Sequence, residues 1–109
     1  GNNDMAIDAF KKAVKINPED GESFSALGEL FAETGENPDI ALVFARQGIA
    51  LSPENGLMYF RLGRILLKIK DNAGALEAFE KAHDLGCDSS ENIELISKLM
   101  TDQLIERAS

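Results

Sequence analysis

The sequence predicts an all-α, right-handed solenoid of about six helices arranged as antiparallel hairpins. Three observations predict this fold. Apolar residues recur at intervals of three and four along the 109 residues, which is the spacing of one helix face. Residues suited to helix capping recur at intervals of 35 and 34 residues, a period typical of stacked supersecondary units. No segment alternates apolar and polar residues between turn signals, so strands are not expected.

The first expected helix could be capped by Asn3 or Asp4, and it ends before Pro18. The second follows Asp20, whose carboxylate can accept a first-turn N–H. Gly35 is expected to end the second helix, because the left-handed position after a helix favours a residue without a Cβ.

The third helix is expected after Asn37, with Pro38 in its first turn, where a missing N–H costs no hydrogen bond. The fourth follows Asn55, the fifth follows Asp71 and the sixth follows Ser89, since each of these side chains can cap a helix. Each helix is expected to have about twelve to eighteen residues, an ordinary length for globular proteins.

Two patterns repeat along these helices. A shift of 35 residues superimposes the second helix on the fourth, and matches Phe24, Leu27, Gly28 and Phe31 with Tyr59, Leu62, Gly63 and Leu66. The first, third and fifth helices share a second pattern, in which small residues stand on either side of a position that is aromatic in two of the three helices. The matched sets are Ala6, Phe10 and Ala13, then Ala41, Ala45 and Gly48, then Ala75, Phe79 and Ala82. Glycine inside a helix costs ~1 kcal/mol, so Gly28 and Gly63 are expected where two helices approach closely.

Both patterns resemble the tetratricopeptide repeat family. Its motif has an aromatic residue, Leu-Gly and a second aromatic residue in the first helix of a hairpin, then Ala-x-x-x-aromatic in the second helix, and proline at the exit. Pro18 and Pro53 match the exit. Ala45 stands in an aromatic slot and Cys87 in a proline slot, and the chain has one extra residue near position 36.

The resemblance divides the single domain into four parts: a half repeat at residues 4–20, full repeats at 21–55 and 56–89, and a terminal helix at 90–107. In the terminal helix we expect Ile93, Ile96 and Met100 to face inward. Other apolar residues remain on the outer sides of both end helices, among them Met5 and Ile105. We therefore expect a segment of a longer protein, or self-association through the terminal helices.

Composition restricts the class of protein. Hydrophobic residues make up 44% of the chain and charged residues 28%, a balance typical of globular domains. The formal net charge of −8 disfavours binding to nucleic acid or to anionic membranes. No apolar run approaches the ~18–20 residues of a membrane span, and the only cysteine cannot form an internal disulfide. We expect a cytoplasmic location.

Residues suited to catalysis are scarce. His83 is the only histidine and Cys87 the only cysteine, so no zinc-ligand spacing exists. We interpret His83 as a solvated surface residue, and Asp4 with Asp8 as a solvated pair near a helix N-terminus. Since Cys87 stands in a proline slot, both Cys87→Ser and Cys87→Pro are expected to fold, the latter with a gain of about 0.4–1 kcal/mol. We predict no enzymatic activity, metal or cofactor.

In the resembled family, the first helix of each hairpin lines a concave groove that binds peptides. The resemblance implies the following groove residues: Glu22, Ser25, Glu29, Ala32 and Glu33 in the second helix, Leu57, Phe60, Arg64, Leu67 and Lys68 in the fourth, and Glu91, Glu94, Lys98 and Thr101 in the sixth. We interpret Leu57, Phe60 and Leu67 as an exposed apolar patch, with a cationic rim formed by Arg64 and Lys68.

The predicted function is a non-enzymatic module that binds a peptide or helix of a partner protein in this groove. The alternative function is a structural element through which a larger repeat protein self-associates. A further alternative is that the sixth helix covers the patch and that Arg64 and Lys68 pair with Glu29 and Glu33. Some family members bind a C-terminal carboxylate through lysine and asparagine. Glu29 stands where such a clamp needs asparagine or a cation, so this type of binding is not expected.

Overall fold

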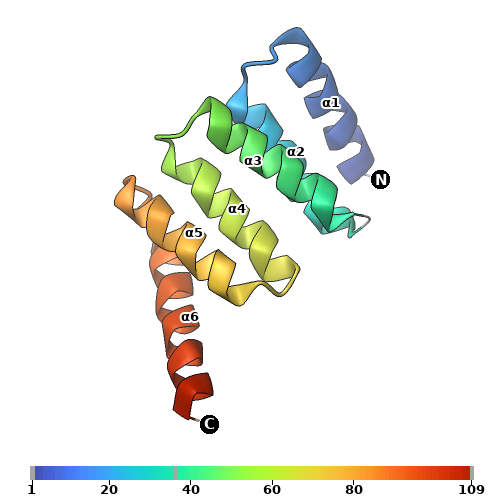
Figure 1. The fold of residues 1–109 in the computed structure, drawn as a ribbon. Helices are drawn as coiled ribbons and strands as arrows, with labels where there is room; N and C mark the ends of the chain where they lie inside the picture. Colours follow the sequence, from blue (N-terminus) through green and yellow to red (C-terminus); the bar gives the residue numbers. More distant parts are fainter. Residues whose placement is uncertain (1, 36, 109) are drawn as a thin grey trace.

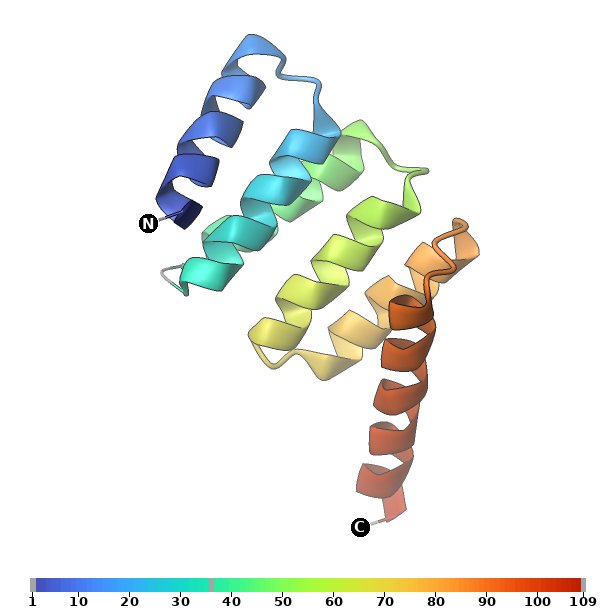
Figure 2. The same ribbon diagram turned by 180° about the vertical axis from the view of Figure 1, so that it is seen from behind.

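The protein is described here by a computed structural model that covers residues 2–35 and 37–108. In this part of the chain the predicted all-α fold is confirmed. The first five helices stack side by side with alternating direction, and the sixth follows the fifth and projects from the stack, so that the two chain ends lie at opposite ends (Figures 1 and 2). The helices are α1 (Asn2–Ile16), α2 (Gly21–Thr34), α3 (Pro38–Leu51), α4 (Gly56–Lys68), α5 (Asn72–Asp84) and α6 (Ser90–Ala108).

Side-chain caps begin five helices where the sequence predicted them: Asp20, Asn37, Asn55 and Asp71 before α2 to α5, and Ser89 before α6. Asp20 accepts hydrogen bonds from both the hydroxyl and the backbone N–H of Ser23, and these bonds lower the pKa of its carboxyl. A lowered pKa in the folded state stabilises the fold at neutral pH, and this contribution is lost as the pH falls through that pKa. The expected cap of α1 is wrong, because Asn3 and Asp4 lie inside the helix.

The end of α5 is a Schellman motif. Gly86 has φ of 96°, in the left-handed region, and its N–H donates to the carbonyl oxygen of His83 at 2.9 Å. The N–H of Cys87 donates to the carbonyl oxygen of Ala82, also at 2.9 Å. The predicted left-handed residue after α2 is confirmed as well, since Gly35 has φ of 70°.

This motif argues against proline at position 87. Proline has no N–H to donate to Ala82, and the buried carbonyl would keep only the longer bond of 3.2 Å from the N–H of Leu85. We expect Cys87→Pro to lower the free energy of unfolding by about 1–3 kcal/mol, and Cys87→Ser to change it by less than about 1 kcal/mol. Chemical denaturation of both variants measures the difference. A Cys87→Pro protein as stable as the wild type would contradict this use of the hydrogen bond.

The predicted close approach of helices at the two glycines is confirmed. A Cβ built on Gly28 would lie 2.8 Å from the carbonyl oxygen of Ala41 in α3, and one on Gly63 would lie 2.5 Å from the ring of Phe79 in α5. Each glycine therefore lies where the two helices of one hairpin cross. No side chain fits at these positions unless the helices separate.

The first complete hairpin compensates for the missing ring at Ala45. Ala45 is fully buried, and the residue before it, Phe44, carries the ring instead. The Phe44 ring stacks on Phe31 with centroids 5.5 Å apart, and on Phe24 at 6.1 Å. The departure from the family motif thus moves the aromatic contact by one residue without removing it.

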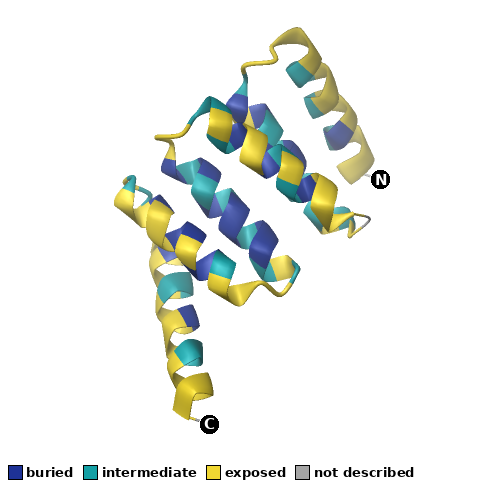
Figure 3. Ribbon diagram, viewed as in Figure 1, coloured by how far each residue is buried: buried dark blue, intermediate teal, exposed yellow. Residues whose placement is uncertain are grey.

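The core lies mainly along α4 and α5, whereas the end helices are largely exposed (Figure 3). Phe79, Met58, Ile65 and Leu27 are among the largest fully buried side chains. α4 is buried on most sides because α2, α3 and α5 all pack against it. This central position makes α4 the helix that orients the charged residues described below.

α6 departs from the repeated arrangement. α2 and α4 pack against each other, whereas α6 packs mainly against α5, and its C-terminal half projects beyond the stack in both views (Figures 1 and 2). The buried Asn92 anchors its start, since Nδ2 donates to the carbonyl oxygens of Phe79 and Cys87 at 3.2 and 3.0 Å.

The expected inward face of α6 is wrong for two of its three residues. Ile93 is 46% exposed and Met100 is 51% exposed. Leu99 is buried instead, and Leu95 and Ile96 are partly buried against the core. The physical reason is that α6 docks against α5 and does not continue the row of α2 and α4, so a different side of the helix meets the protein.

Candidate functional site: a charged surface on α2 and α4

Ion pairs join α2 to α4. Nε of Arg61 lies 3.3 Å from Oε1 of Glu29, and Nη2 of Arg64 lies 3.6 Å from Oε2 of the same carboxylate. Arg61 also reaches Glu22, where its Nη1 donates to the backbone carbonyl oxygen at 3.2 Å. One glutamate on α2 therefore forms ion pairs with two arginines on α4. These ion pairs hold both guanidinium groups on the same surface.

A pair between Arg64 and Glu29 is one of the alternatives expected from the sequence, whereas Arg61 was not expected at this surface. A signal for Arg61 existed: residues three apart on a helix share a face, so Arg61 lies on the side of α4 that carries Arg64. Lys68 and Glu33, the other expected pair, are both exposed and form no ion pair with each other in the described part of the chain.

Phe60 is not part of an exposed patch. It is only 6% exposed, and its ring packs against Phe79 with centroids 5.6 Å apart. The guanidinium of Arg64 lies 5.7 Å from the Phe60 centroid, which is a cation–π distance. Leu57 and Leu67 are half-buried against the core. The expected apolar patch is therefore wrong for Phe60, because this side chain turns toward α5.

Ser25 also lies away from the expected groove. It is fully buried, and a Cβ on Gly48 would lie 3.1 Å from the Ser25 Cβ. Ser25 thus faces α3 inside the hairpin, and a glycine on α3 makes room for it. Its hydroxyl is one of two buried side-chain polar atoms without a hydrogen-bond partner among the described residues.

The residues that remain accessible form what we call the α2–α4 surface. Its members are Glu22, Glu29, Glu33, Leu57, Arg61, Arg64, Leu67 and Lys68. The expected residues of α6, Glu91, Glu94, Lys98 and Thr101, are exposed. No ion pair recorded among the described residues joins them to this surface.

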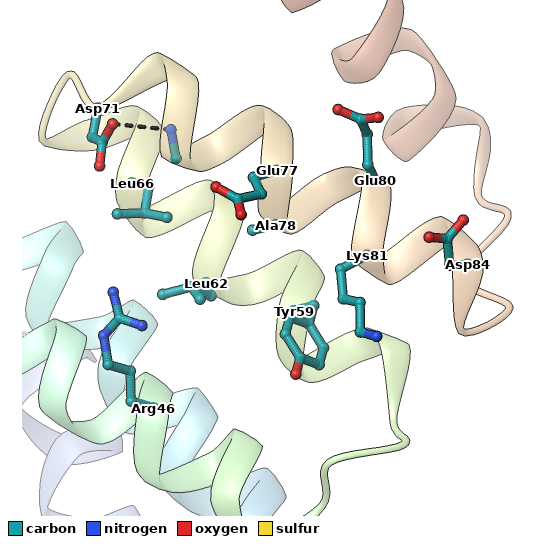
Figure 4. Close-up of a pocket in the computed structure, with 11 residues that line it drawn as sticks. Arg46, Tyr59, Leu62, Leu66, Asp71, Glu77, Ala78, Glu80, Lys81 and Asp84 are labelled. Atoms are coloured by element: carbon teal, nitrogen blue, oxygen red, sulfur yellow. Dashed lines mark hydrogen bonds between the residues drawn. The ribbon is translucent and has the colours of Figure 1, made fainter.

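A hollow that was not expected from the sequence lies between α3 and α5. Its volume is about 660 Å³. Tyr59, Leu62 and Leu66 of α4 form its floor, Arg46 borders it from α3, and acidic residues of α5 such as Glu77 line the opposite side (Figure 4). We call it the outer groove.

His83 and Cys87, the two residues considered above for catalysis, lie near the end of α5. His83 is exposed, as expected, and its Nδ1 lies 2.9 Å from Oδ1 of Asp88. Cys87 is a half-buried free thiol in the turn before α6. Within the described residues, no group of three or more His, Cys, Asp or Glu could hold a metal ion. None of the described helices has both the length and the apolar character needed to cross a membrane.

Stacked hairpins with a glycine at each crossing define an α-helical repeat protein. A family model described as Tetratricopeptide repeat matches residues 1–20 and 57–85. The similar solved structures given next share the fold of this repeat.

Several tetratricopeptide repeat (TPR) domains share the fold. The first TPR of Spaghetti (RPAP3), solved with the HSP90 peptide SRMEEVD, is 17% identical with a TM-score of 0.84, over 95% of this chain and 82% of that one. The Sgt2 TPR domain from Aspergillus fumigatus is 20% identical with a TM-score of 0.88, over 99% and 72%. The first TPR domain of human RPAP3 is 17% identical with a TM-score of 0.86, over 100% and 85%. No curated protein matches the sequence.

Proposed function

We propose that the chain is a non-enzymatic interaction module that binds a peptide or helix of a partner protein on the α2–α4 surface. The observation that carries the proposal is the pair of accessible cations on α4. Arg64 is held over Phe60 yet remains 42% exposed, and Lys68, one turn further along, is exposed. Both lie beside the partly exposed Leu67, so charge and apolar area adjoin.

The charges on this surface favour a mixed ligand. Lys68 and the outer side of Arg64 attract a carboxylate, whereas Glu22 and Glu33 on α2 attract a basic segment and repel an acidic one. Glu29 pairs with both Arg61 and Arg64, and its single negative charge offsets at most half of their combined positive charge. We therefore expect a ligand with one acidic and one large apolar side chain over α4, and without a run of acids over α2.

The expected ligand differs from the peptide that is bound by one of the similar solved structures, the first TPR of Spaghetti. The peptide SRMEEVD bound by the first TPR of Spaghetti carries several carboxylates. Placed on the α2–α4 surface, these groups would approach Glu29 and Glu33, and like charges in close contact weaken binding. We expect SRMEEVD to bind this chain at least tenfold more weakly than a peptide selected on the chain itself, which corresponds to about 1.4 kcal/mol.

The test begins with a random-peptide display library selected on the immobilised chain. The Kd of the selected peptides is then measured for the wild type, Arg64→Glu and Lys68→Glu by calorimetry. Reversing one charge at a contact is expected to weaken binding at least tenfold, or about 1.4 kcal/mol. Both side chains reach solvent, so neither substitution is expected to unfold the helices. Circular dichroism verifies that helicity is retained.

Arg46→Glu is the matched control, because Arg46 is an exposed arginine on α3 at the outer groove. It makes the same charge change and is expected to leave the Kd unchanged. Equal affinity of Arg64→Glu, Lys68→Glu and wild type for every selected peptide would refute the site. A loss of affinity in Arg46→Glu alone would move the site to the outer groove.

A further inference from the structure

A smaller hollow lies between α1 and α3, over one residue of α2. Its volume is about 440 Å³, which is within the range of small ligand sites. Val14 of α1, Leu27 of α2 and Phe44 of α3 provide its apolar lining. We call it the α1–α3 hollow. Its lining residues all come from these three helices, and none of them belongs to the α2–α4 surface.

Three lysines stand at the edge of this hollow. Lys11, Lys12 and Lys15 line it together with Asp8, and their spacing of three and four residues places all four on one exposed face of α1. No ion pair recorded among the described residues involves any of these lysines. The ammonium of Lys11 lies 5.8 Å from the centroid of the Phe31 ring, a cation–π distance. The hollow is therefore apolar inside and positively charged at its edge.

The repeated fold does not require these positive charges. A shift of 69 residues superimposes the small residues of α1 on those of α5, and places Glu80 and Asp84 at the positions of Lys11 and Lys15. Both acids line the outer groove, which is the corresponding hollow one repeat later. The helix dipole accounts for Lys15 in the last turn of α1, but not for Lys11 and Lys12. Folding therefore does not explain the positive edge, whereas an anionic ligand does.

We propose that the α1–α3 hollow binds an acidic peptide segment of a partner protein. One large apolar side chain of the segment enters the hollow against Phe44, and carboxylates on either side of it pair with Lys11 and Lys15. The Cβ atoms of residues four apart on a helix are separated by about 6 Å, which matches carboxylates one helical turn apart in the ligand. Charged contacts around an apolar anchor are typical of protein interfaces. This proposal does not depend on binding at the α2–α4 surface.

The charge of the whole chain favours a short acidic segment over an extended polyanion. The formal net charge is −8, although α1 carries three lysines against two aspartates. Nucleic acid or an anionic membrane would extend beyond α1 and meet a chain that is otherwise strongly acidic. Exposed charges farther away than about 8 Å are largely screened at physiological ionic strength. A short segment in the hollow therefore interacts mainly with the lysines.

The test begins with a display library of acidic peptides, each with one large apolar residue among aspartates and glutamates. The library is selected on a chain that carries Arg64→Glu and Lys68→Glu, because these charges repel acidic peptides from the α2–α4 surface. Calorimetry then measures the Kd of the best peptide for the wild type and for a chain with Lys11→Glu and Lys15→Asp. These two substitutions introduce the residues that α5 carries at the same positions, so the fold is expected to remain. The affinity is expected to fall at least tenfold.

The chain with Arg64→Glu and Lys68→Glu is the matched control, since it also reverses two positive charges. At physiological ionic strength its Kd is expected to stay within about twofold of the wild-type value. A second variant, Lys11→Gln with Lys15→Gln, removes the charges without adding new ones and is expected to weaken binding as well. Replacing the large apolar residue of the peptide with alanine is expected to cost at least tenfold in affinity. Circular dichroism verifies that each variant is folded.

Failure to select any acidic peptide with a Kd below about 100 μM would overturn the proposal. Equal affinity of the wild type and both lysine variants would overturn it too. A DNA duplex or phosphatidylserine vesicles that bind through Lys11 and Lys15 more tightly than the peptide would assign the hollow to a different anion. These results are separate from those at the α2–α4 surface, because the decisive substitutions are in α1.

Discussion

Phe79→Ala is expected to lower the free energy of unfolding by about 3–5 kcal/mol, the usual cost of removing a buried aromatic ring. Phe79 is fully buried, packs against Phe60 and fills the space left by Gly63. Its backbone carbonyl also accepts the hydrogen bond that anchors Asn92 of α6. Loss of the ring therefore leaves a cavity between α4 and α5, whereas the backbone hydrogen bond to Asn92 remains possible.

Thermal unfolding followed by circular dichroism measures this effect. For a domain near this size, a loss of 1 kcal/mol lowers the Tm by about 4–8 °C, so a decrease of at least about 12 °C is expected. Val43→Ala is the matched control, because this exposed α3 side chain contributes little burial, and its effect should stay within about 0.5 kcal/mol. A Phe79→Ala protein with the Tm of this control would contradict the assignment of the core.

Gly28→Val is expected to lower the free energy of unfolding by about 2–3 kcal/mol, although valine is a better helix former than glycine. A Cβ at this position would lie 2.8 Å from the carbonyl oxygen of Ala41 and 3.1 Å from the backbone nitrogen of Ala45. Backbone atoms cannot rotate away as a side chain can. α2 and α3 must therefore separate, which weakens the stacked rings of Phe31 and Phe44.

Urea denaturation of Gly28→Val, with Ala9→Val as the control, tests this cost. Ala9 is exposed on α1, so valine there changes helix propensity alone, by less than about 0.7 kcal/mol. A substitution at Gly28 that costs no more than the one at Ala9 would show that the two helices do not cross at the glycine. Gly28→Ala is expected to fall between the two, since the gain in helix propensity partly offsets the clash.

The candidate site depends on the directions in which side chains point. The sequence pattern predicts these directions less well than it predicts the positions of the helices. The resemblance to the repeat family placed Arg64, Lys68 and Glu29 on one surface, and the contact between Arg64 and Glu29 is present. Phe60 and Ser25 have similar spacing, yet they turn toward the neighbouring second helices. A residue at the edge of a helix face can point either way, and only its neighbours in space settle the direction.

The helices themselves follow from local chemistry. Asp20, Asn37 and Asn55 cap the residues that directly follow them, and Gly35 ends α2 through its own backbone conformation. These interactions span only a few residues, so they can be inferred from adjacent positions. The capping residues recur at intervals of 35 and 34 residues. This recurrence predicts stacked hairpins, because hairpins of nearly equal length pack in the same way.

The orientation of α6 required contacts between distant segments. The hydrogen bonds from Asn92 to the carbonyl groups of Phe79 and Cys87 tie the start of this helix to the end of α5. They bury Leu99 and leave Met100 exposed. The repeat pattern predicts a helix at this place but not its rotation, because the energy that sets the rotation comes from the side of α5 it meets. Local hydrogen bonding determines where helices begin and end, whereas packing between them determines which side chains reach the surface.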